Sequence, residues 1–312
     1  MPPAIEQALQ EEFPEVQIVV ARSTEAYLRE LPRCSILVTA TLKPEQFALC
    51  GKLKWIHSPM AGVTSLLVPA LVASDVVVTN GRTVHSVPVA EQTLAMMFAI
   101  ARRVPACVRF QDRHYWGQDD SWLPGATPFE LHGKTLGLVG MGAIGHELVP
   151  RAKALGMRAV VVRKNVSAPA PGADRVYPRS GLREMLAEAD FVVVAAPDTP
   201  ENIGLIGAAE LRSMKSTAYL INVARGTLVQ TEALIAALNS GVIAGAALDV
   251  TDPEPLPSDH PLWGLPNVLI TPHLGGASDR FWERESALLR ENLRRYLAGQ
   301  PLLNVVEKSR GY

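Results

Sequence analysis

Short apolar runs alternate with amphipathic stretches along most of the chain. Several runs are apolar at nearly every position, as expected for strands that are covered on both faces. Helical patterns lie between them, at 182–189 and 230–241 for example, and the second ends at Gly241. This alternation predicts an α/β fold with parallel sheets and right-handed crossovers. We predict strands at residues 16–21, 35–40, 76–80, 135–140, 158–163, 190–196, 218–223, 243–250 and 267–273.

Three segments differ from this alternation. Residues 4–12 are helix-like, so we expect either that a small domain lacks its usual first strand or that the reading frame starts late. Residues 103–134 are polar and are interrupted by three prolines, and we interpret them as a linker or an arm that could pack on a second subunit. Residues 279–300 predict a long amphipathic helix that ends at Gly299.

The composition is that of a folded, nearly neutral protein. With 312 residues, of which 48% are hydrophobic and 20% charged, the chain can build two domains with real cores. The formal net charge of -1 argues against nucleic acid or an anionic membrane as a partner. We find no signal-peptide pattern and no apolar run of the ~20 residues that a membrane span needs, and we expect a cytoplasmic protein.

The three cysteines show no metal-ligand spacing. Cys34, Cys50 and Cys107 are widely separated, and an odd number of cysteines suits a reducing compartment. We therefore predict that they are buried small apolar residues and that the protein has no metal site.

A glycine-rich loop follows the predicted strand at 135–140. Gly140, Gly142 and Gly145 have the G-x-G-x-x-G spacing, which is a weak signal when it stands alone. Here a helical pattern and another strand follow, and that context predicts a dinucleotide site rather than a structural turn. Gly140 would permit the tight turn, Gly142 the approach of a pyrophosphate, and Gly145 the packing of helix on strand.

The residues after the next strand bear on the choice of dinucleotide. NAD-selective sites usually carry Asp or Glu there, whereas this chain has Arg163, Lys164 and Asn165. The two cations would attract a 2′-phosphate, and arginine can bind it bidentately. We predict NADP(H), with NAD(H) as the alternative if these residues are ordinary surface cations.

Three polar residues follow three of the later predicted strands. Arg225 follows 218–223, Glu254 lies in the loop after 243–250, and His273 ends 267–273. Ligands of open parallel sheets bind at the carboxyl ends of strands, so we expect these residues near the cofactor. Each alone could be structural, but together they suit hydride transfer between a nicotinamide and a 2-keto acid.

Each of these residues has a distinct predicted role. Arg225 offers a planar fork for the substrate carboxylate and could stabilise the developing oxyanion. His273 would give a proton to the carbonyl oxygen as hydride arrives, and take it back in the reverse direction. Glu254 would orient the imidazole and stabilise its protonated form. Asp249 could bind the nicotinamide amide or simply cap the loop.

These motifs together resemble the D-isomer-specific 2-hydroxyacid dehydrogenase family over nearly the whole chain. They are the glycine loop, the run from Ile221 to Gly226, Leu248-Asp249-Val250 with Glu254-Pro255-Leu256, Pro261-Leu262-Trp263, and Thr271-Pro272-His273. The Arg163-Lys164 pair resembles the NADPH-using glyoxylate/hydroxypyruvate reductase branch. The resemblance implies a 2-keto acid or D-2-hydroxy acid substrate and a homodimer.

The resemblance also implies a fold of two doubly wound parallel-sheet domains. A flavodoxin-like substrate domain would comprise 1–100 and 280–312, and a Rossmann domain with a dimerisation arm at 103–134 would comprise 101–279. Backbone N–H groups of Ala61 and Gly62 would hold the substrate carboxylate, together with Arg225 and His273. The predicted cofactor-binding residues are Gly140, Gly142, Ala143, Ile144, Gly145, Arg163, Lys164, Asn165, Ala196, Pro197, Val223, Ala224, Asp249 and Gly275.

Two other functions fit the same motifs. A phosphite-type dehydrogenase would keep the fold and change the substrate. A dinucleotide-sensing corepressor, such as the C-terminal-binding proteins, would bind the cofactor without turning over a keto acid. Turnover with a panel of keto acids separates the enzyme from the sensor.

Overall fold

A computed structural model describes residues 1–123 and 127–311. Positions 124–126 of the predicted arm and position 312 of the predicted substrate domain lie outside the described residues. By its internal contacts the chain divides into two compact units, a small unit of residues 1–85 with 277–312 and a large unit of residues 86–276.

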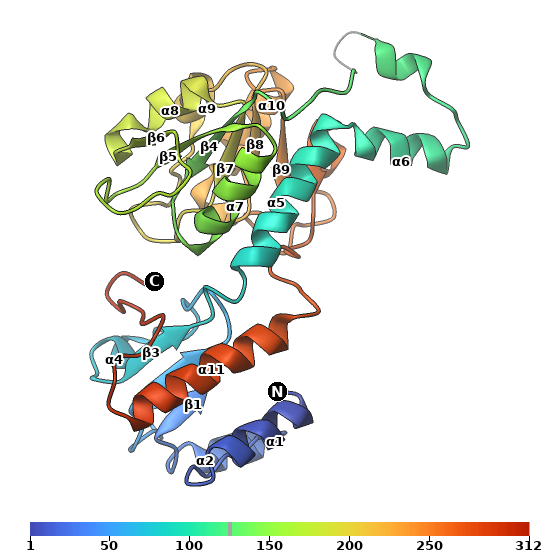
Figure 1. Ribbon diagram of the computed structural model, residues 1–312. Helices are drawn as coiled ribbons and strands as arrows, with labels where there is room; N and C mark the ends of the chain where they lie inside the picture. Colours follow the sequence, from blue (N-terminus) through green and yellow to red (C-terminus); the bar gives the residue numbers. More distant parts are fainter. Residues whose placement is uncertain (124–126, 312) are drawn as a thin grey trace. The chain divides into compact units, whose positions relative to one another are not determined.

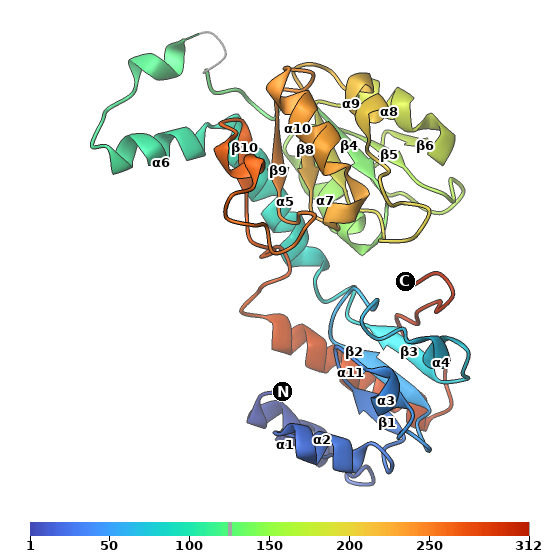
Figure 2. The same ribbon diagram turned by 180° about the vertical axis from the view of Figure 1, so that it is seen from behind.

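The small unit contains a parallel sheet with the strand order β1-β2-β3. Its strands are β1 (Ile36–Val38), β2 (Trp55–Ser58) and β3 (Val77–Asn80). Helix α11 (Phe281–Leu297) covers one face, and the short helices α3 (Pro44–Phe47) and α4 (Pro69–Val72) cover the other, as Figures 1 and 2 show from opposite sides. The unit also includes α1 (Pro3–Glu12) and α2 (Thr24–Glu30).

Alternation along β2 places its side chains in two separate hydrophobic clusters. Ile56 belongs to the cluster that contains Leu71 of α4. Trp55 belongs to the other cluster, with Leu289 and Leu293 of α11. Because successive side chains of a strand point to opposite faces, His57 lies on the Trp55 face, the one that α11 covers.

The predicted strand at 16–21 is wrong. No strand forms there, and the side chain of Gln10 in α1 makes the contacts that a neighbouring strand would otherwise make. Gln10 Nε2 donates to the carbonyl of Val16 at 3.1 Å, and Gln10 Oε1 accepts from the Ile18 amide at 3.4 Å. The apolar run shows that Val16 and Ile18 are partly buried beside α1 and α11, not that they join a sheet.

The large unit is built on a seven-stranded parallel sheet with the order β10-β9-β8-β7-β4-β5-β6. In chain order this is the doubly wound Rossmann arrangement with one added strand. Two strands were not predicted from the sequence: β2 in the small unit and β6 in the large unit. The strands of the large unit are β4 (Thr135–Val139), β5 (Arg158–Val162), β6 (Arg175–Tyr177), β7 (Phe191–Val194), β8 (Tyr219–Asn222), β9 (Gly245–Leu248) and β10 (Val268–Ile270).

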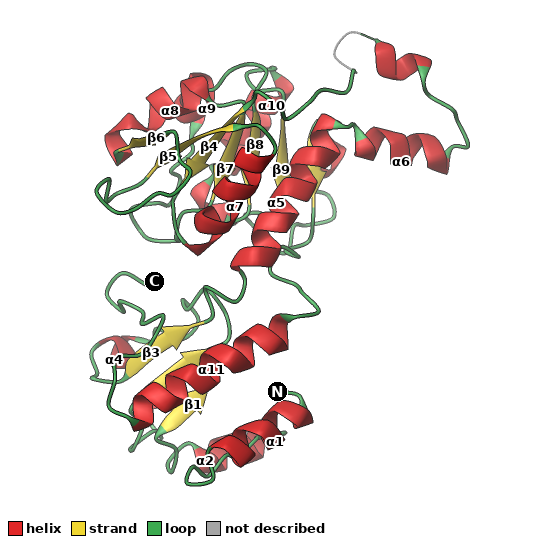
Figure 3. Ribbon diagram, in the orientation of Figure 1, coloured by secondary structure: helices red, strands yellow, loops and turns green. Residues whose placement is uncertain are grey.

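Helices cover both faces of this sheet (Figure 3). Helices α5 (Ser86–Ala101) and α7 (Ala143–Ala154) pack on one face, with Met97 and Leu148 fully buried. On the other face lie α8 (Leu182–Glu188), α9 (Ala208–Ser213) and α10 (Thr231–Asn239), with Met185 and Leu211 fully buried. The apolar runs predicted as strands covered on both faces are confirmed for β4, β5 and β7, whose apolar side chains contribute to both clusters.

Helix α5 belongs to the large unit in this division, because it packs against α7. The predicted boundary of the first domain lies after residue 100, whereas the division by internal contacts lies before residue 86. Beyond α5, the predicted arm forms α6 (Val104–Asp112) and a short 3-10 helix at Asp119–Trp122. In Figure 1 these two elements extend away from the sheet of the large unit.

The cysteines differ from the prediction at one position. Cys34 and Cys50 are partly buried, but Cys107 on α6 is exposed. Burial raises the pKa of the Cys50 thiol to about 11. In the described part of the chain, no helix combines the length and the apolar character that crossing a membrane requires.

Candidate active site

Two of the three loop glycines are required by close packing inside the large unit. Gly140 has a φ of +99°, and a Cβ atom there would lie 2.8 Å from the carbonyl oxygen of Ala195. At Gly145 a Cβ would lie 2.8 Å from Leu138 Cδ2 on β4. Gly140 therefore lets the turn pass close to the loop after β7, and Gly145 lets α7 pack on its preceding strand.

Gly142 has a different environment. A Cβ built there would meet no atom of the described residues within 4 Å, and Gly142 is the N-cap of α7. The first N–H groups of a helix have no acceptor within the helix. In α7 these groups include the amides of Ala143 and Ile144, its first two residues. Open space in front of a helix N-terminus fits a dinucleotide phosphate.

Both cations at the end of β5 contact other parts of the large unit. Arg163 donates to the carbonyl of Pro169 at 3.0 Å and so closes the loop that follows. Lys164 Nζ lies 3.2 Å from a carboxylate oxygen of Glu201, and both side chains are largely exposed. Asn165 Oδ1 accepts from the amide of Ser167 at 3.1 Å. Lys164 therefore lies at the carboxyl end of β5, where its ammonium group is paired with the carboxylate of Glu201.

The loop after β7 is fixed by residues that the sequence analysis did not single out. Asn202 Nδ2 donates to the carbonyl of Pro197 at 2.9 Å. Arg179, which follows β6, donates to Asn202 Oδ1 and to the carbonyl of Glu201. These contacts join the predicted cofactor residues Ala196 and Pro197 to the ends of β5 and β6. No local motif marks them, because Lys164 and Glu201 are 37 positions apart.

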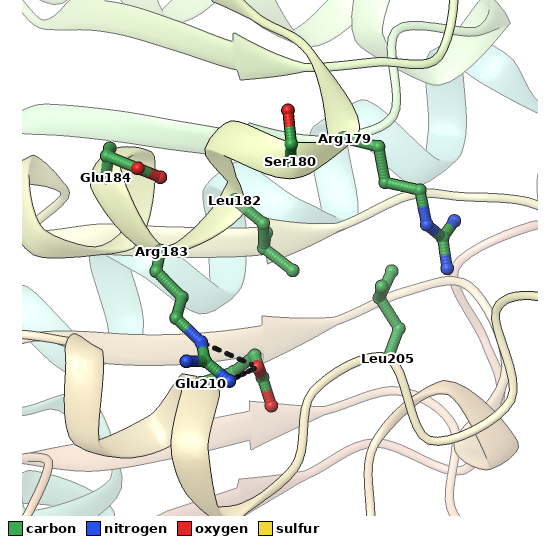
Figure 4. Close-up of a pocket in the computed structure, with 7 residues that line it drawn as sticks. All are labelled: Arg179, Ser180, Leu182, Arg183, Glu184, Leu205 and Glu210. Carbon is green, nitrogen blue, oxygen red and sulfur yellow. Dashed lines mark hydrogen bonds and ion pairs between the residues drawn. The ribbon is translucent and has the colours of Figure 1, made fainter.

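A surface hollow of about 430 Å³ lies beside the start of α8 (Figure 4). Arg183 reaches across it to Glu210 on α9 at 3.0 Å. Its lining includes neither Arg225, Glu254 nor His273. The hollow therefore holds the Arg183–Glu210 pair and none of the residues predicted to carry the reaction.

Arg225 follows β8 and is held by its neighbours. Asn222 Nδ2 donates to the carbonyl of Arg225 at 2.8 Å, and Asn222 Oδ1 accepts from the amide of Ala224 at 3.1 Å. A Cβ at Gly226 would lie 2.0 Å from the carbonyl oxygen of Thr251, so only glycine fits where this turn passes the loop after β9. Val223 is buried beneath the same turn.

Glu254 and His273 are brought together from consecutive strand ends. His273 Nδ1 lies 2.5 Å from Glu254 Oε1, and each side chain is about two-fifths exposed. Since a carboxylate oxygen accepts, Nδ1 carries a hydrogen and Nε2 remains available to a ligand. His273 has a φ of +53°, and its amide donates to the carbonyl of Asp249 at 2.8 Å. The pair has the geometry of a proton carrier and its orienting acid.

Asp249 caps the loop that carries His273. Its Oδ1 accepts from Thr271 Oγ1 at 2.5 Å and from the Leu274 amide at 3.0 Å, and its Oδ2 accepts from the Gly275 amide at 2.8 Å. The carboxylate is buried and takes three donors. Of the two roles considered from the sequence, the structure therefore displays the cap.

Ala61 and Gly62 lie in the exposed loop that follows β2 in the small unit. The loop's carbonyls are bound from within that unit. His85 Nε2 donates to Pro59 at 3.1 Å, the Gly81 amide to Met60 at 3.1 Å, and Asn80 Nδ2 to Ala61 at 2.7 Å. Among the described residues, no backbone carbonyl accepts a hydrogen bond from the amides of Ala61 and Gly62. The loop thus presents free N–H donors, as an anion-binding segment does.

Arg225, Glu254 and His273 follow three adjacent parallel strands, β8, β9 and β10. The carboxyl ends of parallel strands lie at the same edge, and the glycine loop follows β4 at that edge. In Figure 2 these three strands lie side by side. The large unit thus combines a dinucleotide loop with a cation, a carboxylate and a histidine, a set suited to reduction of a carbonyl beside a carboxylate.

Comparisons with known proteins agree with this reading. The family model described as "D-isomer specific 2-hydroxyacid dehydrogenase, NAD binding domain" matches residues 94–275. A glyoxylate reductase of Korarchaeum cryptofilum is 34% identical over 92% of this chain and 86% of its own length. A D-3-phosphoglycerate dehydrogenase of Methanocaldococcus jannaschii is 34% identical over 95% of this chain, which spans 56% of that relative's length.

Solved structures give the same assignment. A D-isomer specific 2-hydroxyacid dehydrogenase from Xanthobacter autotrophicus, in complex with NADPH and MES, has a TM-score of 0.83 and 32% identity, covering 99% of this chain and 95% of that one. An NADPH-dependent glyoxylate/hydroxypyruvate reductase from Sinorhizobium meliloti, in complex with NADP and sulfate, has a TM-score of 0.84 and 26% identity, covering 100% and 97%. The chain therefore belongs to the D-isomer specific 2-hydroxyacid dehydrogenase family and is an NAD(P)-dependent oxidoreductase.

Proposed function

We propose that the protein is an NADPH-dependent 2-keto acid reductase, with His273 as acid/base, Glu254 as its orienting carboxylate and Arg225 as the substrate-binding cation. The His273–Glu254 contact of 2.5 Å at adjoining strand ends is the observation that carries this proposal. The bound cofactor would supply the hydride to the keto carbon.

The chain's own residues account for the other requirements of the reaction. His273 Nε2 would donate a proton to the carbonyl oxygen as negative charge develops there, while Glu254 stabilises the ring in the orientation that Nδ1 defines. Arg225 would donate two parallel hydrogen bonds to the substrate carboxylate and carbonyl. The free amides of Ala61 and Gly62 would hold the carboxylate as further donors. Asp249 would keep the His273 loop in place through its three hydrogen bonds.

The preference for NADPH is proposed from the charges after β5. Arg163 and Lys164 stand where an NAD-selective site usually has an acid, and the two structural relatives named above were solved with NADPH or NADP. Arg179 adds a third cation at the ends of β5 and β6. Glu201 opposes them, because it pairs with Lys164 and would repel a 2′-phosphate.

Glu201 should therefore limit the preference for NADPH. Replacing it with glutamine releases Lys164 for the phosphate, and exposed ion pairs are worth up to about 1 kcal/mol, so we expect kcat/KM with NADPH to rise about fivefold relative to NADH. Lys164→Gln should shift the ratio the other way. The measurement is glyoxylate reduction with each cofactor, with Glu184→Gln on the exposed face of α8 as the matched control.

Two outcomes would count against the cofactor assignment. The first is a wild-type protein that uses NADH as efficiently as NADPH. The second is an unchanged NADPH-to-NADH ratio in both the Glu201 and the Lys164 variants, because the 2′-phosphate would then lie elsewhere. The homodimer and the dimerisation arm stay predictions from the family resemblance, and the cytoplasmic location stays a prediction from the sequence pattern.

A further inference from the structure

A buried pair of ionisable side chains, His57 and Glu285, lies at the end of β2, the strand that leads into the Ala61–Gly62 loop. His57 is the third residue of β2, and its side chain is fully buried. Glu285 lies in the first turns of α11, and its side chain is 3% exposed. His57 Nε2 is 2.8 Å from Glu285 Oε1, so the pair connects segments that are 228 positions apart. Nothing in the proposed reaction uses either residue.

The pair belongs to a series of hydrogen bonds that runs from Trp55 through Thr79 and His57 to Glu285. Strand register places Thr79 of β3 beside His57. Trp55 Nε1 donates to Thr79 Oγ1 at 2.8 Å, and His57 Nδ1 is also 2.8 Å from that hydroxyl. If the hydroxyl donates to Nδ1, then Nε2 carries the hydrogen and donates to Glu285. Each hydrogen bond from Trp55 to Glu285 then has one donor and one acceptor.

Glu285 has a second oxygen that the chain does not satisfy. Oε2 is buried and has no hydrogen-bond partner among the described residues. It lies close to Gly81, where an added Cβ would be 3.4 Å from Oε2 and 2.4 Å from the carbonyl oxygen of Pro59. A buried ion pair is weak evidence for stability, because an apolar pair of similar volume often serves as well. The position of this pair, against the loop, suggests a different role.

The residues around the pair are also the residues that orient the loop. The Gly81 amide binds the carbonyl of Met60, and Asn80, the last residue of β3, binds the carbonyl of Ala61. The pair fixes β2 and β3 to α11 immediately before these contacts. We propose that His57 and Glu285 are positioning residues, which hold the Ala61–Gly62 amides in place to receive the substrate carboxylate. The inference rests on the proposed function.

The test separates positioning from folding. Glu285→Leu leaves His57 without its acceptor, so we expect KM for the keto acid to rise about tenfold, because displaced Ala61 and Gly62 amides would make weaker hydrogen bonds to the substrate carboxylate. The kcat value at saturating substrate and the Kd for NADPH should stay within twofold. Glu285→Gln keeps an acceptor at Oε1 and should return KM to within about threefold of wild type. Glu283→Gln, exposed on the same helix, is the control.

A double variant keeps the test decisive if Glu285→Leu does not fold. Replacing His57 with leucine and Glu285 with methionine removes both partners and leaves no unpaired buried charge. We expect this protein to fold, as thermal melting will show, and to keep the raised KM. A folded double variant with the wild-type KM would overturn the inference, as would a loss shared equally by kcat, KM and NADPH binding. If the wild type itself reduces no keto acid, the proposed function fails instead.

Discussion

Replacing His273 with asparagine should lower kcat for keto acid reduction by about 10²–10⁴-fold, the usual contribution of a general acid. The physical reason is that the carboxamide cannot deliver a proton to the carbonyl oxygen. Asparagine is chosen because His273 has a φ of +53°, a conformation that asparagine adopts more readily than most residues. NADPH affinity should stay within a few-fold of wild type, and fluorescence titration measures it.

The matched control is another histidine of the large unit. His260 accepts a hydrogen bond from the Leu262 amide at the start of a 3-10 helix, and asparagine can replace it as a cap. His260→Asn should therefore keep wild-type turnover. Near-normal turnover in His273→Asn, with an unchanged melting temperature, would show that His273 is not the proton donor.

Replacing Arg225 with glutamine should lower kcat/KM by about 10²–10³-fold, because the variant loses charged donors to both the carboxylate and the developing oxyanion. Lysine at this position restores the charge but not the planar fork, so Arg225→Lys should give an intermediate value. Steady-state kinetics with a saturating concentration of NADPH measures both variants. Most of the loss should appear in KM for the keto acid, with a further decrease in kcat.

Arg212, exposed on α9, provides the control for charge alone. Arg212→Gln has the same change in net charge and should leave kcat/KM unchanged. Equal effects of the two glutamine variants would mean that Arg225 acts through the general field of the protein. An Arg225→Gln variant with wild-type KM would remove it from the substrate site.

The predicted placement of the site depended on features that are local in sequence. The strands β8, β9 and β10 each lie within an apolar run. Arg225, Glu254 and His273 lie in the loops that follow these strands, in that order. Parallel strands bring their carboxyl ends to one edge, so the neighbourhood of these residues followed from the alternation pattern. The glycine spacing was equally local, and the structure gives Gly140 and Gly145 the packing roles that the motif predicts.

The remaining contacts depend on long-range packing. Lys164 pairs with Glu201, which is 37 positions away in the sequence, and His57 contacts Glu285, which is 228 positions away. Contacts between residues so far apart produce no periodic pattern in the sequence. The error at 16–21 has the same origin, because apolar residues beside a helix and apolar residues in a strand give the same run. Cys107 was predicted to be buried from its residue type, whereas its place on the exposed α6 decided otherwise.

The most direct test of the proposed reaction follows the transferred hydrogen. The protein would be supplied with NADPH carrying deuterium at both C4 positions and with glyoxylate, hydroxypyruvate, pyruvate, phenylpyruvate or ketoisocaproate. Our account predicts that at least one keto acid is reduced, and that the hydroxy acid carries one deuterium at C2 for each NADPH oxidised, in the D configuration where C2 is chiral. Tight NADPH binding without reduction of any of these acids, or a product without deuterium at C2, would contradict it.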